Sequence, residues 1–126
     1  KAIRWVTNLR AGGGTNPWQG LSDAMKSINV EQVVILSDGI TRNKGRCWHN
    51  NQYMNMAECF AQANTLRKNN GVSDVNIEAV SLGYDFCSGN SLPSWFNRYY
   101  GNHPDFSKSW LGELSSKNGG SCKHIQ

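Results

Sequence analysis

The sequence lacks long hydrophobic runs, and its charged residues are few and scattered. No apolar stretch of the 126-residue chain approaches the length that crosses a bilayer, so we expect no membrane insertion. The net charge is only +4 and the basic residues form no long run, which argues against nucleic acid as a partner. Hydrophobic residues make up 38% of the chain, which suffices for the core of a single domain over residues 1–126.

Motifs of several enzyme classes are also missing. The chain has no Gly-x-Ser-x-Gly segment, which excludes the nucleophile elbow of α/β-hydrolases. Its triple glycine at 12–14 is not followed by the lysine of a phosphate-binding loop. Residues 33–41 faintly echo the motif of haloacid dehalogenases, but the nucleophilic first aspartate is absent. We therefore expect a protein that is not an enzyme.

Four cysteines are present, and none of them belongs to a Cys-x-x-Cys pair, so a zinc ribbon or a redox motif is not expected. An even number in loop-rich surroundings favours two disulfides and an oxidising compartment, and hence a secreted or cell-surface protein. Three pairings are possible, and the sequence does not choose among them. We favour Cys47 with Cys59, which would clip a polar loop to a helix, and Cys87 with Cys122.

Helical and strand patterns alternate along the chain. Four segments have the apolar spacing that predicts a helix: 2–9, 17–28, 56–66 and 107–117. Three further segments are predicted as strands: 33–36, 75–82 and 121–125. The first of these is a continuous apolar run, typical of a strand covered on both faces. The segment 41–51 is polar and irregular, and 84–104 is a long aromatic loop with a helical turn at 95–100.

This alternation predicts an α/β fold with a Rossmann-like parallel sheet, right-handed crossovers and helices on both faces. The binding site of such a sheet lies beyond the carboxyl ends of its strands. Asp38 follows the first predicted strand, and Tyr84 and Asp85 follow the second. We therefore expect these three residues at one edge of the sheet, flanked by the loops 41–51 and 84–104.

The aromatic loop has two interpretations. Its rings could stack on a sugar, which makes carbohydrate a possible partner. We favour the other interpretation, in which they pack the loop onto the domain. The residues concerned are Trp95, Phe96, Tyr99 and Tyr100.

A glycine loop precedes the helix predicted at 17–28. Asn16 or Thr15 suits the N-cap of this helix, and Pro17 suits its first turn. A hydroxyl on such a loop and a carboxylate at a strand end are also ligands for a hard cation. Thr15 and Asp38 are therefore candidate metal ligands, although a helix cap and an ordinary turn explain them equally simply.

The order of these motifs resembles a von Willebrand factor type A domain over nearly the whole chain. The resemblance is carried by Gly-Gly-Thr-Asn at 13–16, Val-Val-Ile-Leu-Ser-Asp-Gly at 33–39, the strand at 77–83 and the glycines at 119–120. It implies an adhesion or protein-interaction module in which Thr15 and Asp38 bind magnesium or calcium, and the metal takes a carboxylate from the partner. The following residues are candidates for contact with that ligand: Asn16, Trp18, Tyr84 and Asp85.

The family's Asp-x-Ser-x-Ser segment is absent, because only 14 residues precede Thr15. The chain resembles roughly the C-terminal two-thirds of such a domain, and it begins at Lys1 without a signal peptide. We expect the missing segment on a longer precursor, on another chain or in a proteolysed remainder. The expected partner is then a protein ligand or the remainder of its own domain. The alternative is a structural or assembly subunit, such as a pilus- or filament-associated one, with a degenerate metal site.

Overall fold

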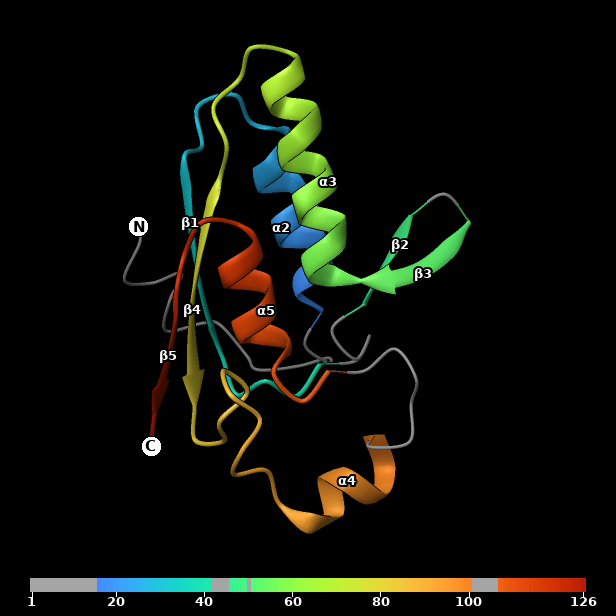
Figure 1. Cartoon of the computed structure of the whole chain (residues 1–126), viewed down its shortest axis with the longest axis vertical. Coiled ribbons are helices and arrows are strands. Elements are labelled where there is room, and N and C mark those ends of the chain that lie inside the picture. The colour runs from blue at the N-terminus through green and yellow to red at the C-terminus, as the bar shows by residue number, and fades with distance from the viewer. Residues whose placement is uncertain (1–15, 42–45, 50, 101–106) are drawn as a thin grey trace, which may run out of the picture.

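The computed structural model describes residues 16–41, 46–49, 51–100 and 107–126. Its helices are α2 (Pro17–Lys26), α3 (Met56–Asn69), α4 (Ser94–Tyr100) and α5 (Trp110–Lys117). Its strands are β1 (Gln32–Ser37), β2 (Arg46–His49), β3 (Gln52–Asn55), β4 (Asn76–Leu82) and β5 (Cys122–Ile125). Figure 1 shows β1, β4 and β5 side by side, with α2, α3 and α5 beside them. None of the helices in these ranges is long and apolar enough to span a membrane.

The strands β1, β4 and β5 form a parallel sheet in the order β1-β4-β5. Ser37 at the end of β1 pairs with Ser81 of β4, and Ala79 pairs with Cys122 of β5. The carboxyl ends of β1 and β4 therefore lie at one edge. The predicted α/β fold with a parallel sheet is confirmed, while its Rossmann-like details are not shown.

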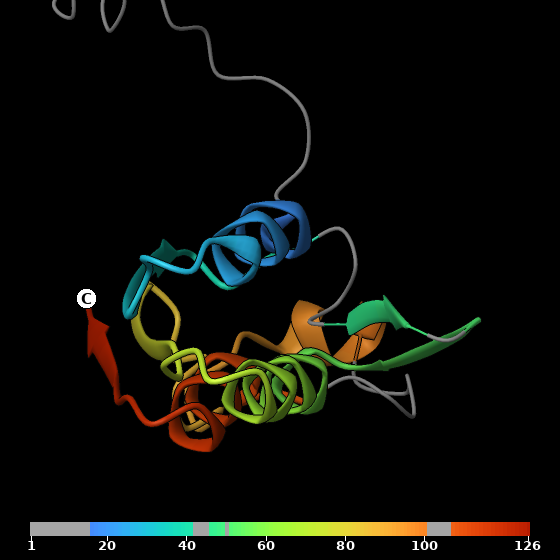
Figure 2. The same ribbon diagram turned by 90° about the horizontal axis from the view of Figure 1, so that it is seen from above.

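The described helices lie on one face of this sheet. Figure 2 shows α2, α3 and α5 on the same side of the three strands, and Ile77 and Ala79 on that face are buried. On the other face, Val34 is 55% exposed and Leu36 is 65% exposed. We predicted that β1 is covered on both faces, and within the described residues this prediction is wrong. An apolar run in the sequence does not distinguish a strand buried on one face from a strand buried on two. The helix predicted at 2–9 lies outside the described residues.

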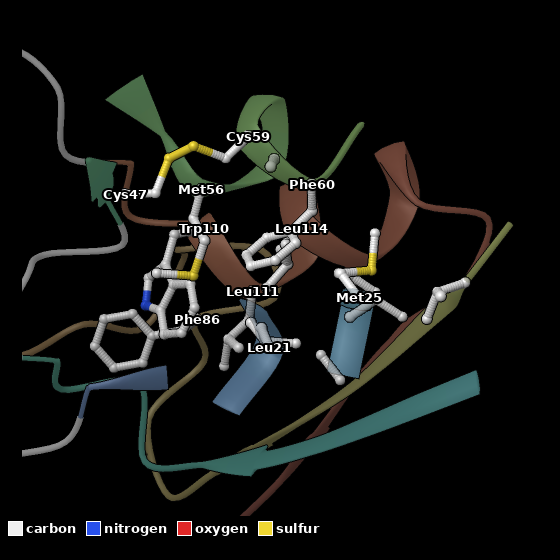
Figure 3. Packing of buried hydrophobic residues seen from close by; sticks show 14 of the residues in the cluster. Leu21, Met25, Cys47, Met56, Cys59, Phe60, Phe86, Trp110, Leu111 and Leu114 are labelled. Atoms are coloured by element: carbon white, nitrogen blue, oxygen red, sulfur yellow. A yellow bond between two sulfur atoms is a disulfide. The ribbon is translucent and has the colours of Figure 1, made fainter. Parts of the chain in front are cut away.

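The core fills the space between the three helices and the inner face of the sheet. Figure 3 shows Leu21 and Met25 of α2, Phe60 of α3, and Leu111 and Leu114 of α5 close together in this space. Leu21 and Met25 have the helical spacing that predicts α2, and both are buried on its inner face, which confirms this part of the predicted apolar face. The last predicted helix is confirmed too, but it begins at Trp110 and not at residue 107.

Helix α2 ends at Lys26, two residues before the predicted end of its apolar face. Arg67 of α3 is only 7% exposed and closes this end of the helix. Its guanidinium donates hydrogen bonds of 2.7 to 2.9 Å to four backbone carbonyl oxygens: those of Met25, Ser27, Val30 and Ser73. Ile28 lies in the turn that these bonds stabilise and is exposed, so its predicted place on the apolar face of the helix is wrong.

Residues 41–51 were predicted to be irregular, but they contain β2. This strand pairs antiparallel with β3, and Asn51 between them has a positive φ of 60°. A hairpin turn with positive φ suits asparagine, yet the strands are too short to show a clear alternation, and the apolar residues of each are neighbours in the chain. The disulfide Cys47–Cys59 joins β2 to α3, and Cys87–Cys122 joins the loop after β4 to β5. Both favoured pairings are confirmed.

Candidate functional site at the carboxyl edge of the sheet

Asp38 lies directly after β1, and its side chain is exposed. The carboxylate Oδ1 accepts a hydrogen bond of 3.0 Å from the backbone N–H of Ile40. Behind it, the buried hydroxyl of Ser37 accepts one of 3.0 Å from the N–H of Gly39. These two bonds form a compact turn, in which the carboxylate of Asp38 faces solvent.

Contacts from distant parts of the chain immobilise this turn. Gly39 has a φ of +76°, and a Cβ at this position would lie 1.8 Å from a ring carbon of Phe86. Only glycine fits both the conformation and the space. The carbonyl oxygen of Gly39 accepts a hydrogen bond of 2.9 Å from Nε1 of Trp110, the first residue of α5. The position of Asp38 is therefore set by β4, its following loop and α5 together.

The loop after β4 lies beside this turn, because Ser81 pairs with Ser37 across the two strands. Ser81 is fully buried. Its Oγ donates a bond of 2.6 Å to the carbonyl oxygen of Tyr84 and accepts one of 3.1 Å from the N–H of Phe86. Tyr84 itself is exposed, and its ring packs against that of Trp95 with 6.3 Å between the centroids.

Asp85 uses its carboxylate within its own loop. Oδ1 accepts hydrogen bonds from the N–H groups of Cys87 and Ser88 at 3.0 and 2.9 Å, and Oδ2 accepts one from the Ser88 hydroxyl. The bond from the Ser88 hydroxyl is the largest cause that lowers the pKa of Asp85 below its ordinary value, and the charge of His124 acts in the same direction. The ionised carboxylate therefore orders the loop, and its contact with a ligand stays a prediction.

The remaining predicted residues lie on and before α2. Asn16 caps this helix, because its side chain accepts a hydrogen bond of 3.2 Å from the N–H of Trp18. The half-buried ring of Trp18 packs on Phe60, with 5.4 Å between the ring centroids, and so belongs to the core. Thr15 lies outside the described residues, and its role as a metal ligand stays a prediction.

The described donors do not form a complete cation site. A hard divalent cation binds about six oxygen ligands, of which magnesium keeps several as water. Within the described ranges, no group of three or more His, Cys, Asp or Glu side chains could hold a metal ion. Asp38 contributes one carboxylate, and both oxygens of Asp85 are already hydrogen-bonded within their loop. A cation at this edge would need further donors.

The residues of the aromatic loop do not all fit one interpretation, either packing onto the domain or stacking on a sugar. Phe96 is buried and packs against Phe86, with 5.1 Å between their ring centroids, which confirms for this residue that the loop packs onto the domain. Trp95 is exposed, and sugar stacking stays untested for it. The side chains of Tyr99 and Tyr100 lie outside what the structure describes.

Sequence reasoning missed two residues that hold the candidate site in place. Trp110 fixes the turn after β1, and Ser81 fixes the loop after β4. Each combines a polar atom with an apolar neighbourhood. Ser81 interrupts the aliphatic strand β4, and Trp110 opens the apolar face of α5. Buried polar groups require hydrogen-bond partners, so such positions are recognisable candidates for loop anchors.

Comparisons with known proteins identify no relative. No family model matches the chain, and no curated protein or solved structure matches it significantly. The resemblance to von Willebrand factor type A domains therefore rests on the sequence motifs alone.

Proposed function

We propose that the chain is a non-enzymatic, extracellular adhesion or protein-interaction module of the von Willebrand factor type A kind. Its partner binds at the carboxyl edge of the sheet with the help of magnesium or calcium. The main support is the exposed carboxylate of Asp38 on a turn that Trp110 and Phe86 immobilise. A donor that is already ordered loses little freedom on binding, which favours its use as a ligand. The two disulfides agree with an oxidising compartment.

The remaining cation ligands are proposed to come from the remainder of the same domain. This is supported by β1, which pairs only with β4 among the described strands although Val33 to Leu36 are all aliphatic. A long, apolar edge strand is prone to pair with another segment. A strand added along β1 in parallel would end beside the turn of Asp38.

Cation titration tests the proposal. Magnesium and calcium are titrated by calorimetry, and thermal unfolding is followed at millimolar cation. We expect weak, measurable heat and a rise in Tm of about one degree at millimolar cation. This chain supplies only part of the ligand set, and a ligand that binds the native state weakly stabilises it little. Asp38→Asn should abolish both, whereas Asp74→Asn, which removes an exposed carboxylate before β4, should leave them unchanged. The absence of heat and of a Tm shift at millimolar cation would contradict metal binding by this chain.

The second candidate is a structural or assembly subunit with a degenerate metal site. It is favoured by the exposed aliphatic side chains of Val34, Leu36, Leu82 and Ile125. All four lie on one face, because Leu36 pairs with Val80 in register and Leu82 pairs with Ile125. Concentration-dependent assembly in light scattering, reversed by Leu36→Lys and insensitive to cations, would identify this function.

A further inference from the structure

The helices α3 and α5 end in the same way, with an asparagine followed by a glycine. Asn70 is the C-cap of α3, and Asn118 is the C-cap of α5. The residues that follow, Gly71 and Gly119, have φ values of +72° and +74°. In each motif, the N–H two residues after the asparagine donates a hydrogen bond to the carbonyl oxygen three residues before it, at 2.9 Å in α3 and 3.0 Å in α5. The two dipeptides therefore share a common helix-ending motif, and their surroundings distinguish them.

The side chain of Asn118 is part of the core. The residue is 3% exposed, and its Nδ2 donates hydrogen bonds of 2.8 and 3.4 Å to the carbonyl oxygens of Leu114 and Ala57. Its Oδ1 accepts one of 3.1 Å from the side chain of Asn64. Since leaving buried polar groups without partners costs free energy, these bonds hold the amide in one orientation. It cannot turn towards the backbone nitrogen of Gly119 without breaking them.

The surroundings of Asn70 are open. Asn70 and Gly71 are both exposed, and Figure 1 shows this end of α3 at the top, where the chain turns towards β4. A Cβ built on Gly71 would meet no heavy atom within 4 Å. The N–H of Gly71 donates a hydrogen bond of 3.0 Å to the carbonyl oxygen of Lys68, which lies in the exposed last turn. The ends of helices open readily, so this bond is broken in a fraction of the folded molecules.

We infer that Asn70 is a site of spontaneous deamidation in the folded protein, whereas Asn118 is protected. The nitrogen of Gly71 attacks the side-chain carbonyl carbon of Asn70. It loses its proton as the new carbon–nitrogen bond forms, and the side-chain amide leaves as ammonia. The resulting five-membered imide takes up one water molecule and opens to aspartate or isoaspartate. Glycine favours this attack, because it has no side chain to hinder it and its backbone adopts many conformations.

The same attack, with loss of water, would convert Asp38 to isoaspartate, because Asp38 also precedes a glycine. The structure opposes it. The N–H of the buried Gly39 donates a hydrogen bond of 3.0 Å to the hydroxyl of Ser37, and the Asp38 carboxylate accepts one from the N–H of Ile40. The ring of Phe86 fills the space beside this glycine. We therefore expect the turn of Asp38 to keep its normal backbone linkage while the protein is folded.

Deamidation at Asn70 changes the end of α3. It adds a negative charge where the helix carbonyls already carry partial negative charge, which disfavours the folded state. Isoaspartate also adds a methylene group to the backbone. The same end of the helix carries Arg67, whose guanidinium closes α2. We expect Asn70→Asp to lower the Tm by about 2 °C. The inference goes beyond the proposed function, because the reaction needs water but neither a cation nor a partner.

The test follows the three dipeptides by peptide mapping and mass spectrometry. The whole chain, with intact disulfides and EDTA in the buffer, is incubated at neutral pH in its native state and in urea. Isoaspartate is detected by labelling with an isoaspartate methyltransferase. In the native protein, deamidation should be about tenfold or more faster at Asn70 than at Asn118, because the core must open before Asn118 can react. In urea the two rates should become similar, since the surroundings are lost.

A matched variant checks the assignment. Asn70→Gln should abolish the product at position 70 and leave the rate at Asn118 unchanged, because the longer side chain of glutamine forms a cyclic imide slowly. Equal rates at Asn70 and Asn118 in the native protein would overturn the inference. An Asn70 that stays intact in the native protein while it reacts in urea would overturn it as well. Because EDTA is present throughout, these outcomes are independent of the cation proposed at Asp38.

Discussion

The two faces of the parallel sheet are both rich in aliphatic residues, but only one is covered by the described helices. On the inner face, Ile77 and Ala79 are buried under α5 and its neighbours. On the outer face, Val34 and Leu36 are more exposed than buried. Hydrophobic side chains are therefore no proof of burial, whereas a contiguous exposed group of them is typical of an interface. The contrast supports a segment or partner that covers the outer face.

Truncations on the two faces should show the largest difference. Ile77→Ala on the inner face should lower the free energy of unfolding by about 3 kcal/mol, because it removes packing and leaves a cavity. Leu36→Ala on the outer face should change it by less than about 0.5 kcal/mol, as exposed substitutions do. Urea unfolding with intact disulfides measures both. Equal losses would show that the outer face is covered in solution.

On the helix side of the sheet, loss of the Arg67 guanidinium should have the next largest effect. Arg67→Met keeps most of the stem but leaves four buried or half-buried carbonyl oxygens without their donor. We expect a loss of about 2 kcal/mol in the free energy of unfolding, from the same urea measurement. Lys68→Met alters the exposed neighbour and should be nearly neutral. If both variants behave alike, the carbonyl oxygens find other donors.

A smaller loss in the free energy of unfolding is expected at the carboxyl edge of the sheet, where the turn of Asp38 lies. Trp110→Phe removes the hydrogen bond from Nε1 to the carbonyl oxygen of Gly39 and should cost about 1 kcal/mol. The turn of Asp38 should also loosen, so hydrogen exchange at the N–H of Ile40 should accelerate. Trp18→Phe is the control because Trp18 packs on Phe60, and it should leave that exchange rate unchanged.

The smallest expected effect is the pH dependence contributed by Asp85. Its pKa in the folded protein lies below the ordinary value of 3.8, so the ionised form favours folding. This stabilisation is present above about pH 4, and it is lost as the pH falls through the lowered folded pKa. In acid titrations of thermal stability, Asp85→Asn should remove this component, while Asp74→Asn should retain it. An unchanged acid profile for Asp85→Asn would refute the role of Asp85 in ordering the loop.

Much of the fold could be predicted because its signals are local. Asn16 and Pro17 mark the start of α2, and the aliphatic run before Ser37 marks β1. The placement of Asp38 and Tyr84 at one edge followed from the parallel arrangement of β1 and β4 alone. The hairpin was missed because β2 and β3 have four residues each. Their apolar residues are neighbours in the chain, Cys47 with Trp48 and Tyr53 with Met54, so no period-two pattern is visible.

By itself, the sequence determined the order of α2, β1, α3, β4, α5 and β5 and the choice of a parallel sheet, and it limited the cap of α2 to Thr15 or Asn16. These depend on residues close together in the chain. Only the tertiary structure decided that one face of β1 is exposed, that Arg67 closes α2, and that Trp110 fixes the turn of Asp38. The last contact joins residues 71 positions apart. Such contacts depend on how whole elements pack, and no local pattern of residues encodes which distant group will satisfy a buried carbonyl oxygen or cover an aliphatic side chain.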